Sequence, residues 1–316
     1  MFFFSSSVLK KYLYDAKHAH NLYKNRLTES RMGFHLNLEE LIHIESVIKP
    51  LINKGQSLHH IVINNRDELM VSERTLYRLI DSNEMDIKNI DLPRKVRYKP
   101  RAKSKQFVVD KDYRKGRTYD DFINFISENP DINVVQMDTL EGVKGGAVLL
   151  TLHFLNTNLQ LSYLRETNTA RSVSDVFEYL YNTLGHDDFT TLFPVILTDM
   201  GNEFTNPKAI EFNSSGERRT RIFYCNPKCP EDKGSCEKNH VEIRKILPKG
   251  RSFNNLNQHD INLVMSHVNS YCRKKLNGKS PYLSFNFIYG ESILNKLGIN
   301  YIPPNDVILK PSLIKK

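Results

Sequence analysis

Apolar positions in the first fifty residues repeat at helical spacing. Side chains three and four positions apart share one face of a helix, so this spacing predicts helices from about residue 8 to residue 50. Two sets of residues carry it: Leu9, Tyr12, Leu13, Ala16 and Ala19, and then Leu38, Leu41, Ile42, Ile44, Val47 and Ile48.

Two shorter helices are predicted after residue 55. Ser57 can cap the first, which ends near Asn64, and Ser72 can cap the second, because a serine hydroxyl accepts a hydrogen bond from a free amide of the first turn. Leu76, Leu79 and Ile80 would form the buried side of the second helix. This pattern indicates a helix-turn-helix module over about residues 39–82, within a helical region at 1–91.

In a helix-turn-helix module the start of the second helix contacts base edges in the major groove. The side chains expected to be exposed there are Glu73, Arg74, Tyr77 and Arg78, and Arg74 is best suited to a bidentate contact with guanine. The alternative is a helical domain whose arginines are only solvated. DNA binding is favoured because a basic segment follows.

That basic segment covers residues 92–117. Pro93 and Pro100 oppose a continuous helix, and like charges keep the chain extended, so we expect a linker that contacts the phosphate backbone or serves only as a solvated tether. The cations expected to contact DNA are Arg94, Lys95, Arg97, Lys99 and Arg101, and Lys103 and Lys105 follow them.

From Tyr119 the pattern changes to alternating strands and helices. A short amphipathic helix should end near Asn129, and the apolar run to Thr139 predicts the first strand. Two further strands, a helix that ends at Gly185, a strand that ends at Asp199 and a last strand should follow, at 147–155, 159–164, 172–184, 193–199 and 221–225. A strand reached through a helix lies parallel to its partner, so we expect an α/β fold with a mixed sheet over 118–316 and further helices at its end.

The composition favours a globular protein with a polyanionic partner. The 316 residues carry a formal net charge of +9, with a pI near 9.2, and 40% of them are hydrophobic. No apolar stretch approaches the roughly 20 residues of a membrane-spanning helix, and the opening segment lacks the basic start of a signal peptide. Four cysteines do not describe a disulfide framework, so we expect a reducing cytoplasm.

Three carboxylates stand in short blocks suited to a metal site. Asp138 and Asp199 end apolar runs, and Glu237 opens a segment with helical spacing. Converging carboxylates can hold two divalent cations about 4 Å apart, an arrangement that drives attack on phosphodiesters. Hard oxygen ligands suit Mg²⁺ or Mn²⁺. Cys225, Cys229, Cys236 and His240 have a spacing that zinc would accept, but incidental free thiols are favoured.

The blocks QMDTLEG, LTDMGNEF and KGSCEKNHVEIRKILPKG resemble the catalytic core of DDE transposases, with the closest similarity to bacterial insertion-sequence transposases of the type that includes the insertion-sequence-thirty family. The likeness runs from about Tyr119 to the C-terminal end and includes RSFNNLNQHDINLVMSHVNSY and LNGKSPY. It implies a ribonuclease-H-like fold and an integrase-like core. It also implies that Asp138, Asp199 and Glu237 bind two Mg²⁺ or Mn²⁺ ions.

The resemblance also suggests roles for residues near this triad. Arg244 matches a basic residue that contacts a phosphate near the scissile bond, whereas Glu203 matches an acid outside the triad. Asn239 and His240 are nearby polar residues, and His240 is favoured as a packing or DNA-contact residue rather than a metal ligand. This chain departs from the pattern at two positions, with Met200 where relatives have Asn and Asp232 where they have Gln.

The implied reaction is cleavage at the ends of an insertion sequence, followed by attack of the freed 3′-hydroxyl on target DNA. The implied partners are terminal inverted repeats, target DNA and further copies of this chain in an active homo-oligomer. Relatives of this type also have an additional N-terminal recognition segment. The alternative is therefore a truncated or catalytically inactive DNA-binding protein, and a metal nuclease without strand transfer is the third hypothesis.

Overall fold

The structure is a computed structural model that describes residues 15–29, 36–93, 112–226 and 234–314. The chain divides into two compact units, residues 1–43 and 44–316. Helix α1 (Ala16–Glu29) belongs to the first unit, and α2 (Leu38–Asn53) begins there and ends in the second. Both lie where helical spacing was predicted.

The predicted pair of short helices is present in the second unit. It consists of α3 (Leu58–Asn64) and α5 (Glu73–Asp81). Ser57 and Ser72 cap them as expected, accepting from the amides of His60 and Thr75. Leu76, Leu79 and Ile80 are buried. A four-residue helix, α4 (Arg66–Leu69), lies in the turn between them. The sequence did not predict it, because so short a segment carries no periodic pattern.

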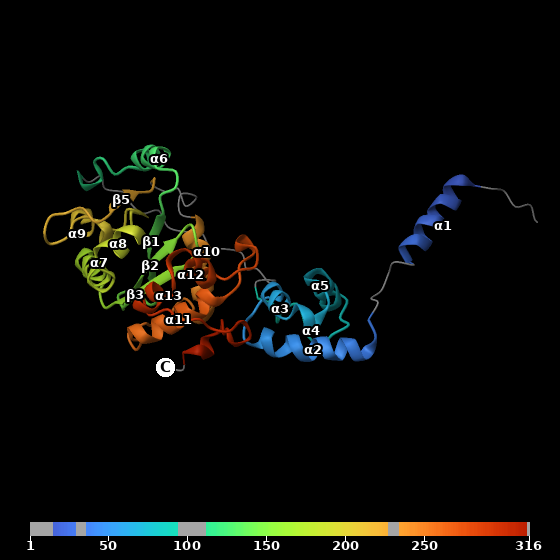
Figure 1. Cartoon of the computed structure of the whole chain (residues 1–316). Helices are drawn as coiled ribbons and strands as arrows, with labels where there is room; N and C mark the ends of the chain where they lie inside the picture. The colour runs from blue at the N-terminus through green and yellow to red at the C-terminus, as the bar shows by residue number, and fades with distance from the viewer. Residues whose placement is uncertain (1–14, 30–35, 94–111, 227–233, 315–316) are drawn as a thin grey trace, which may run out of the picture. The chain divides into compact units, whose positions relative to one another are not determined.

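The centre of the second unit is a five-stranded sheet with the order β3-β2-β1-β4-β5 (Figure 1). Strand β1 pairs antiparallel with β2, which pairs antiparallel with β3, whereas β4 runs parallel to both β1 and β5. The strands are Val134–Glu141, Val148–Phe154, Gln160–Arg165, Val195–Thr198 and Arg221–Tyr224. This mixed sheet with flanking helices confirms the expected ribonuclease-H-like fold.

The α-helices of this part of the chain are α6 (Tyr119–Glu128), α7 (Ala170–Leu184), α8 (His186–Leu192), α9 (Pro207–Glu211), α10 (Gly234–Ile246), α11 (Gln258–Ser270), α12 (Pro281–Tyr289) and α13 (Glu291–Lys296). Short 3₁₀ turns are η1 (Asp112–Arg114), η2 (Asn202–Phe204), η4 (Lys274–Leu276), η5 (Pro304–Asp306) and η6 (Pro311–Leu313). Thr169 starts α7 two residues earlier than predicted, because its side chain and that of Ser172 form a reciprocal cap. Gly185 ends α7 with φ 85°, as expected, and α8 follows it at once.

Two apolar layers cover the sheet. On one face Val135, Ile196 and Ile222 belong to the large core that includes buried residues of α7, α8 and α11. On the other face Val134, Leu197 and Phe223 pack with Phe122 of α6. Successive side chains of a strand point to opposite faces, so Asp138 lies on the same side of β1 as Val134. Among the described residues, no helix is long and apolar enough to cross a membrane.

Acid should destabilise this unit because three of its histidines are buried as neutral rings. Burial lowers the pKa of His60 and of His267 to about 4 and that of His153 to about 3. The unfolded chain therefore binds more protons than the native chain below pH 6.5, and stability should fall by several kcal/mol as the pH drops from 6.5 toward 4. Urea unfolding at pH 7 and pH 4.5 measures this loss.

A matched pair of variants tests the cause. His267→Asn keeps an acceptor near Nδ1, which receives the amide of Ile308 at 3.1 Å, and should reduce the pH dependence. His259→Asn changes an exposed histidine of α11 and should leave it unaltered. If the free energy of unfolding depends on pH equally in both variants, the buried histidine is not the cause of the acid sensitivity.

Candidate active site

Asp138 lies on β1, and Asp199 directly follows β4, the neighbouring parallel strand at the centre of the sheet. The last registered pair between β1 and β4 is Met137 with Thr198, and each aspartate is the next residue along its chain segment. Parallel strands lie about 4.8 Å apart, so the two backbones bring these carboxylates together on one side of the sheet. Both side chains are half-buried.

Each aspartate is oriented by a backbone amide. One oxygen of Asp138 accepts from the Thr139 amide at 2.8 Å, and one oxygen of Asp199 accepts from the Gly201 amide at 3.0 Å. Gly201 has a φ of −58°, which any residue can adopt, so its backbone angle does not require glycine. A Cβ there would lie 2.6 Å from an oxygen of Glu203, so the glycine leaves room for that carboxylate.

His240 on α10 faces Asp138. Its Nδ1 lies 3.9 Å from Oδ2 of Asp138, and its Nε2 lies 2.8 Å from the Thr151 hydroxyl. That hydroxyl donates to the carbonyl of Asp138 at 3.0 Å, so it accepts a proton from Nε2. Nδ1, the other ring nitrogen, faces the Asp138 carboxylate. Sequence reasoning did not place His240 beside this aspartate; the signal was its position one helical turn after Glu237.

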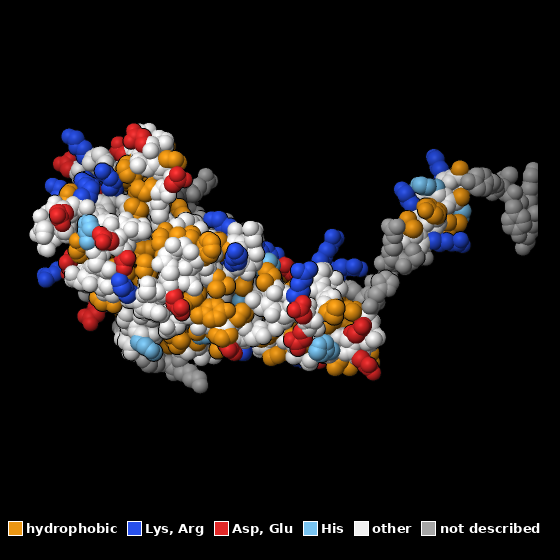
Figure 2. Space-filling model, in the orientation of Figure 1, with side chains coloured by type: hydrophobic (Ala, Val, Ile, Leu, Met, Phe, Trp, Pro, Cys, Tyr) orange, Lys and Arg blue, Asp and Glu red, His pale blue; other side chains and the backbone are white. Residues whose placement is uncertain are grey.

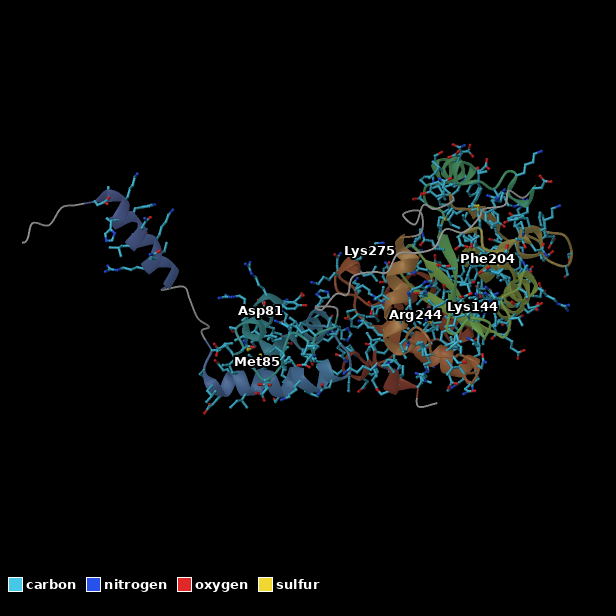
Figure 3. The ribbon with its side chains drawn as sticks, turned by 180° about the vertical axis from the view of Figure 1, so that it is seen from behind. Asp81, Met85, Lys144, Phe204, Arg244 and Lys275 are labelled. Carbon is cyan, nitrogen blue, oxygen red and sulfur yellow. The ribbon has the colours of Figure 1, made fainter. Side chains whose placement is uncertain are left out.

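Glu237 lies in the first turns of α10, but its side chain is outside the described part of the structure. The helix contacts β1 and β2, the strands that carry Asp138 and Thr151. Arg244, two turns after Glu237, is half-buried beside β1 (Figure 3) and donates to the carbonyl of Glu141 at 2.6 Å. Burial lowers the pKa of this guanidinium.

A second arginine, Arg165, forms hydrogen bonds with residues next to the site. Arg165 is buried at the end of β3, and burial lowers its pKa to about 10. It donates to the Thr139 hydroxyl and to Asn168, each at 3.0 Å, and to the Ser172 hydroxyl at 3.1 Å. These bonds fix the residue next to Asp138, while the charge of Glu203 partly offsets the effect of burial on Arg165.

The segment before α6 reaches the same side of the molecule. Arg114 contacts the sulfur of Met200, the residue after Asp199. Burial raises the pKa of Tyr113, and the charge of Asp199 adds a smaller effect in the same direction. Tyr113 packs against Tyr224 of β5 with ring centroids 5.3 Å apart. Basic side chains gather over the region of α9 and β5 (Figure 2), to which the exposed Lys208, Arg218 and Arg221 belong. Sequence reasoning had assigned residues 112–117 only to the linker.

The candidate DNA-reading residues on α5 differ in their surroundings. Arg74 and Arg78 are exposed, whereas Tyr77 is half-buried. The expectation that Glu73 and Tyr77 are exposed is wrong, because both are half-buried. The Glu73 carboxylate lies 2.7 Å from Nζ of Lys274 and 3.1 Å from Nδ1 of His59. The predicted linker cations Arg94, Lys95, Arg97, Lys99 and Arg101 lie outside the described residues.

The carboxylate oxygens described at this site are ligands that hard divalent cations prefer. Asp138 and Asp199 offer carboxylate oxygens at adjacent strands, which suit Mg²⁺ or Mn²⁺. Within the described residues, no three His, Cys, Asp or Glu side chains are grouped to hold a metal. Of the four residues with zinc-like spacing, Cys225 is buried in the layer that includes Phe122 and Phe223, and the side chains of Cys229 and Cys236 are not described.

Comparison with known proteins identifies relatives that are named as transposases and integrases. A transposase for insertion-like sequence element IS1161 of Streptococcus salivarius is 25% identical over 233 residues, which are 72% of this chain and 62% of that protein. An integrase (ORF3) of Spiroplasma virus SpV1-R8A2 B is 25% identical over 147 residues, 46% and 44% of the two chains. The transposase InsI of element IS30A from Escherichia coli is 31% identical over 61 residues, 19% and 16% of the two chains.

This chain thus spans less than two thirds of the length of these three relatives. No family model matches it. Among solved structures, the catalytic core of HTLV-2 integrase in complex with magnesium aligns with 48% of this chain and 93% of its own, at 18% identity and a TM-score of 0.34.

Proposed function

We propose that the chain is a DDE-type transposase that cuts DNA at the ends of an insertion sequence and joins the freed ends to target DNA. The observation that carries this proposal is the position of Asp138 on β1 and of Asp199 directly after the adjacent parallel strand β4, with α10 against β1. The similarity to proteins named as transposases supports it, and the stretch similar to InsI supports the insertion-sequence-thirty type.

Asp138, Asp199 and Glu237 are the proposed ligands of two Mg²⁺ or Mn²⁺ ions. Such ions, when bound, would activate the attacking water or 3′-hydroxyl and stabilise the leaving oxygen. The residues of the chain would hold the ions and orient the DNA. The amides of Thr139 and Gly201 fix the rotation of the two aspartates. The proposed role of Arg244 is to contact a phosphate next to the reacting one.

The helical region at 1–91 is the proposed reader of terminal inverted repeats, through Arg74, Tyr77 and Arg78 on α5. The basic residues of segment 92–117 and the exposed cations near β5 would contact the phosphate backbone of element or target DNA. Residues 118–316 would then be the catalytic core. Strand transfer to a second DNA requires several DNA segments to be held at once, so we propose a homo-oligomer as the active form.

The direct test incubates the full chain with Mg²⁺ or Mn²⁺ and a duplex that carries the terminal repeats of its element. We expect a free 3′-hydroxyl at the element end and joined products with target DNA, both abolished by EDTA. End binding without metal-dependent cleavage would instead support the non-catalytic DNA-binding protein. In that case Met200→Asn with Asp232→Gln would be the first change to restore activity. Cleavage without joining would support a metal nuclease.

Arg74→Ala should weaken binding to the terminal repeat because a bidentate contact with a base is worth about 1–3 kcal/mol of discrimination. Arg78→Ala should have a similar or smaller effect. Affinity for unrelated DNA should change little, so the ratio of specific to nonspecific Kd is the quantity to measure. Lys88→Ala, a change of an exposed cation after α5, is the matched control. An unchanged ratio in both arginine variants would exclude α5 as the reading helix.

A further inference from the structure

The predicted DNA-reading helices are joined to the C-terminal end of the catalytic unit by a buried polar contact surface, here called the joint. On the helical side it consists of Gln56, His60 and Asn65. On the other side it consists of two segments more than 200 residues later in the sequence, 271–279 and 303–309. Its C-terminal segments include residues 276–279, the first four of the block LNGKSPY, to which the proposed reaction gives no role.

His60 is the centre of the joint. The ring is fully buried and stacks on Tyr271, with centroids 4.7 Å apart and planes 24° apart. Its Nδ1 accepts from the amide of Cys272 at 3.0 Å, which leaves the proton on Nε2, and Nε2 donates to the carbonyl of Pro304 at 2.9 Å. One side chain of α3 therefore bonds to both C-terminal segments at once.

Other bonds close the joint around this ring. Gln56 is also fully buried and donates to the carbonyls of Val307 and Pro304 at 2.9 and 3.1 Å. Asn65 and Asn305 exchange two amide hydrogen bonds of 3.0 and 2.9 Å, and the Tyr271 hydroxyl donates to Ser57, the cap of α3.

Two glycines with positive φ lie in the joint, one against backbone and one against a side chain. Gly55 has φ 84°, and a Cβ there would lie 2.7 Å from the carbonyl oxygen of Leu309, whose amide donates to Lys54 at 2.8 Å. Gly278 has φ 83°, and a Cβ there would lie 2.7 Å from the side chain of Ile63. Figure 3 labels Lys275 on η4, the turn whose neighbouring Lys274 pairs with Glu73 at the start of α5.

Opening the joint would leave buried donors and acceptors without partners, and each such loss is costly in free energy. Several bonds would be lost together, so an open form should be rare. The sequence suggests a tethered arrangement, because residues 92–117 connect the two regions. The contacts show instead that α3 and α5 are attached through the opposite end of the chain.

We propose that the joint fixes the reading helix α5 at one distance and orientation from Asp138 and Asp199, so that the sequence read by α5 sets which phosphodiester is cut. His60 and Gln56 are then positioning residues for the reaction. This inference rests on the proposed function, because it assumes that α5 binds DNA and that the aspartates act on it. Its structural part, a rigid connection, stands independently.

The first experiment measures rigidity without DNA or metal. Spin labels attached through an unnatural amino acid at positions 84 and 208, both exposed, report the distribution of distances between α5's end and α9 in the full chain. The unmodified joint should give one narrow distribution. His60→Ala with Gln56→Ala should broaden it, and His60→Asn, which keeps an acceptor for the Cys272 amide, should stay close to the original. A broad distribution for the unmodified joint would overturn the proposal.

The second experiment maps cleavage positions on a terminal repeat. The unmodified chain should cut at one phosphodiester. The loosened double variant should cut at several neighbouring positions and lose cleavage at the correct one on the order of a hundred-fold, since misplacement by about 1 Å has that effect. Its Kd for the repeat should not change. His259→Ala is the control for a histidine change outside the joint.

The two experiments separate the possible failures. A chain that binds repeats but does not cut them contradicts the proposed function, while the label distances still report on the joint. A double variant that broadens the distances but cuts at the same single position contradicts only the positioning role. Thermal unfolding of each variant identifies general loss of folding, in which case Asn65→Ala replaces the double variant.

Discussion

Replacing Glu237 by glutamine is expected to abolish metal-dependent cleavage and strand transfer while binding to DNA ends stays nearly unchanged. Glutamine keeps the size and hydrogen bonding of the side chain but removes the negative charge that would hold a cation. Groove contacts by Arg74 and Arg78 do not depend on that charge. Residues that act as one catalytic group lose activity together, so we expect a decrease in cleavage rate of roughly 10³-fold or more.

Asp138→Asn and Asp199→Asn should give the same result, and a double variant should be no worse than either single one. Single-turnover cleavage and a parallel gel-shift titration measure both quantities. Glu203→Gln is the matched control, because this carboxylate lies at Gly201, close to Asp199, but outside the proposed triad. If Glu203→Gln abolishes cleavage and one triad variant does not, the ligand assignments must be exchanged.

Much of the architecture could be predicted because the signals are local. Ser57 and Ser72 mark the starts of α3 and α5, Gly185 marks the end of α7, and the apolar runs before Asp138 and Asp199 are β1 and β4. Patterns of this kind act over a few residues, so they identify elements well. The parallel pairing followed from the helix between the two strands, which a crossover requires.

The contacts that the sequence did not predict join residues that lie far apart along the chain. His240 meets Thr151 across 89 residues, and His60 meets Cys272 across 212. No local spacing encodes such pairs. Gly201 shows a second limit, because its close neighbour is the side chain of Glu203 and not a special backbone angle. Glu73 shows a third, since a surface position of an isolated helix can be occupied by another segment, here Lys274.

The attachment of residues 112–117 to the sheet is also a long-range contact, and it depends on one buried carboxylate. The Glu211 side chain is 2% exposed. Its oxygens accept from Nε of Arg117 at 3.2 Å and from the amide of Ile222 at 3.1 Å, and Arg218 lies 3.4 Å away. Arg117 in turn donates to the carbonyl of Tyr113 at 3.2 Å, and its own carbonyl accepts from the amide of Tyr224 at 2.9 Å.

Glu211→Ala is therefore expected to destabilise the chain by about 3–5 kcal/mol, because removing one partner of a buried ion pair leaves the other charge uncompensated. Glu211→Gln keeps one acceptor oxygen and should cost less. The exposed Glu128 at the end of α6 offers a control, and Glu128→Ala should stay within about 0.5 kcal/mol of the original. Urea unfolding at pH 7 measures all three.

The Glu211→Ala substitution should also affect the candidate active site. Arg114 contacts Met200, and Arg117 connects this segment to β5 through its bonds with the carbonyl of Tyr113 and the amide of Tyr224. In Glu211→Ala, proteolysis after Arg114 or Arg117 should become faster than cleavage elsewhere in residues 118–316, because this segment detaches first. DNA cleavage should fall at temperatures where the sheet remains folded. Uniform proteolysis across the unit would show instead that Glu211 stabilises the sheet as a whole and has no particular role in holding this segment at the site.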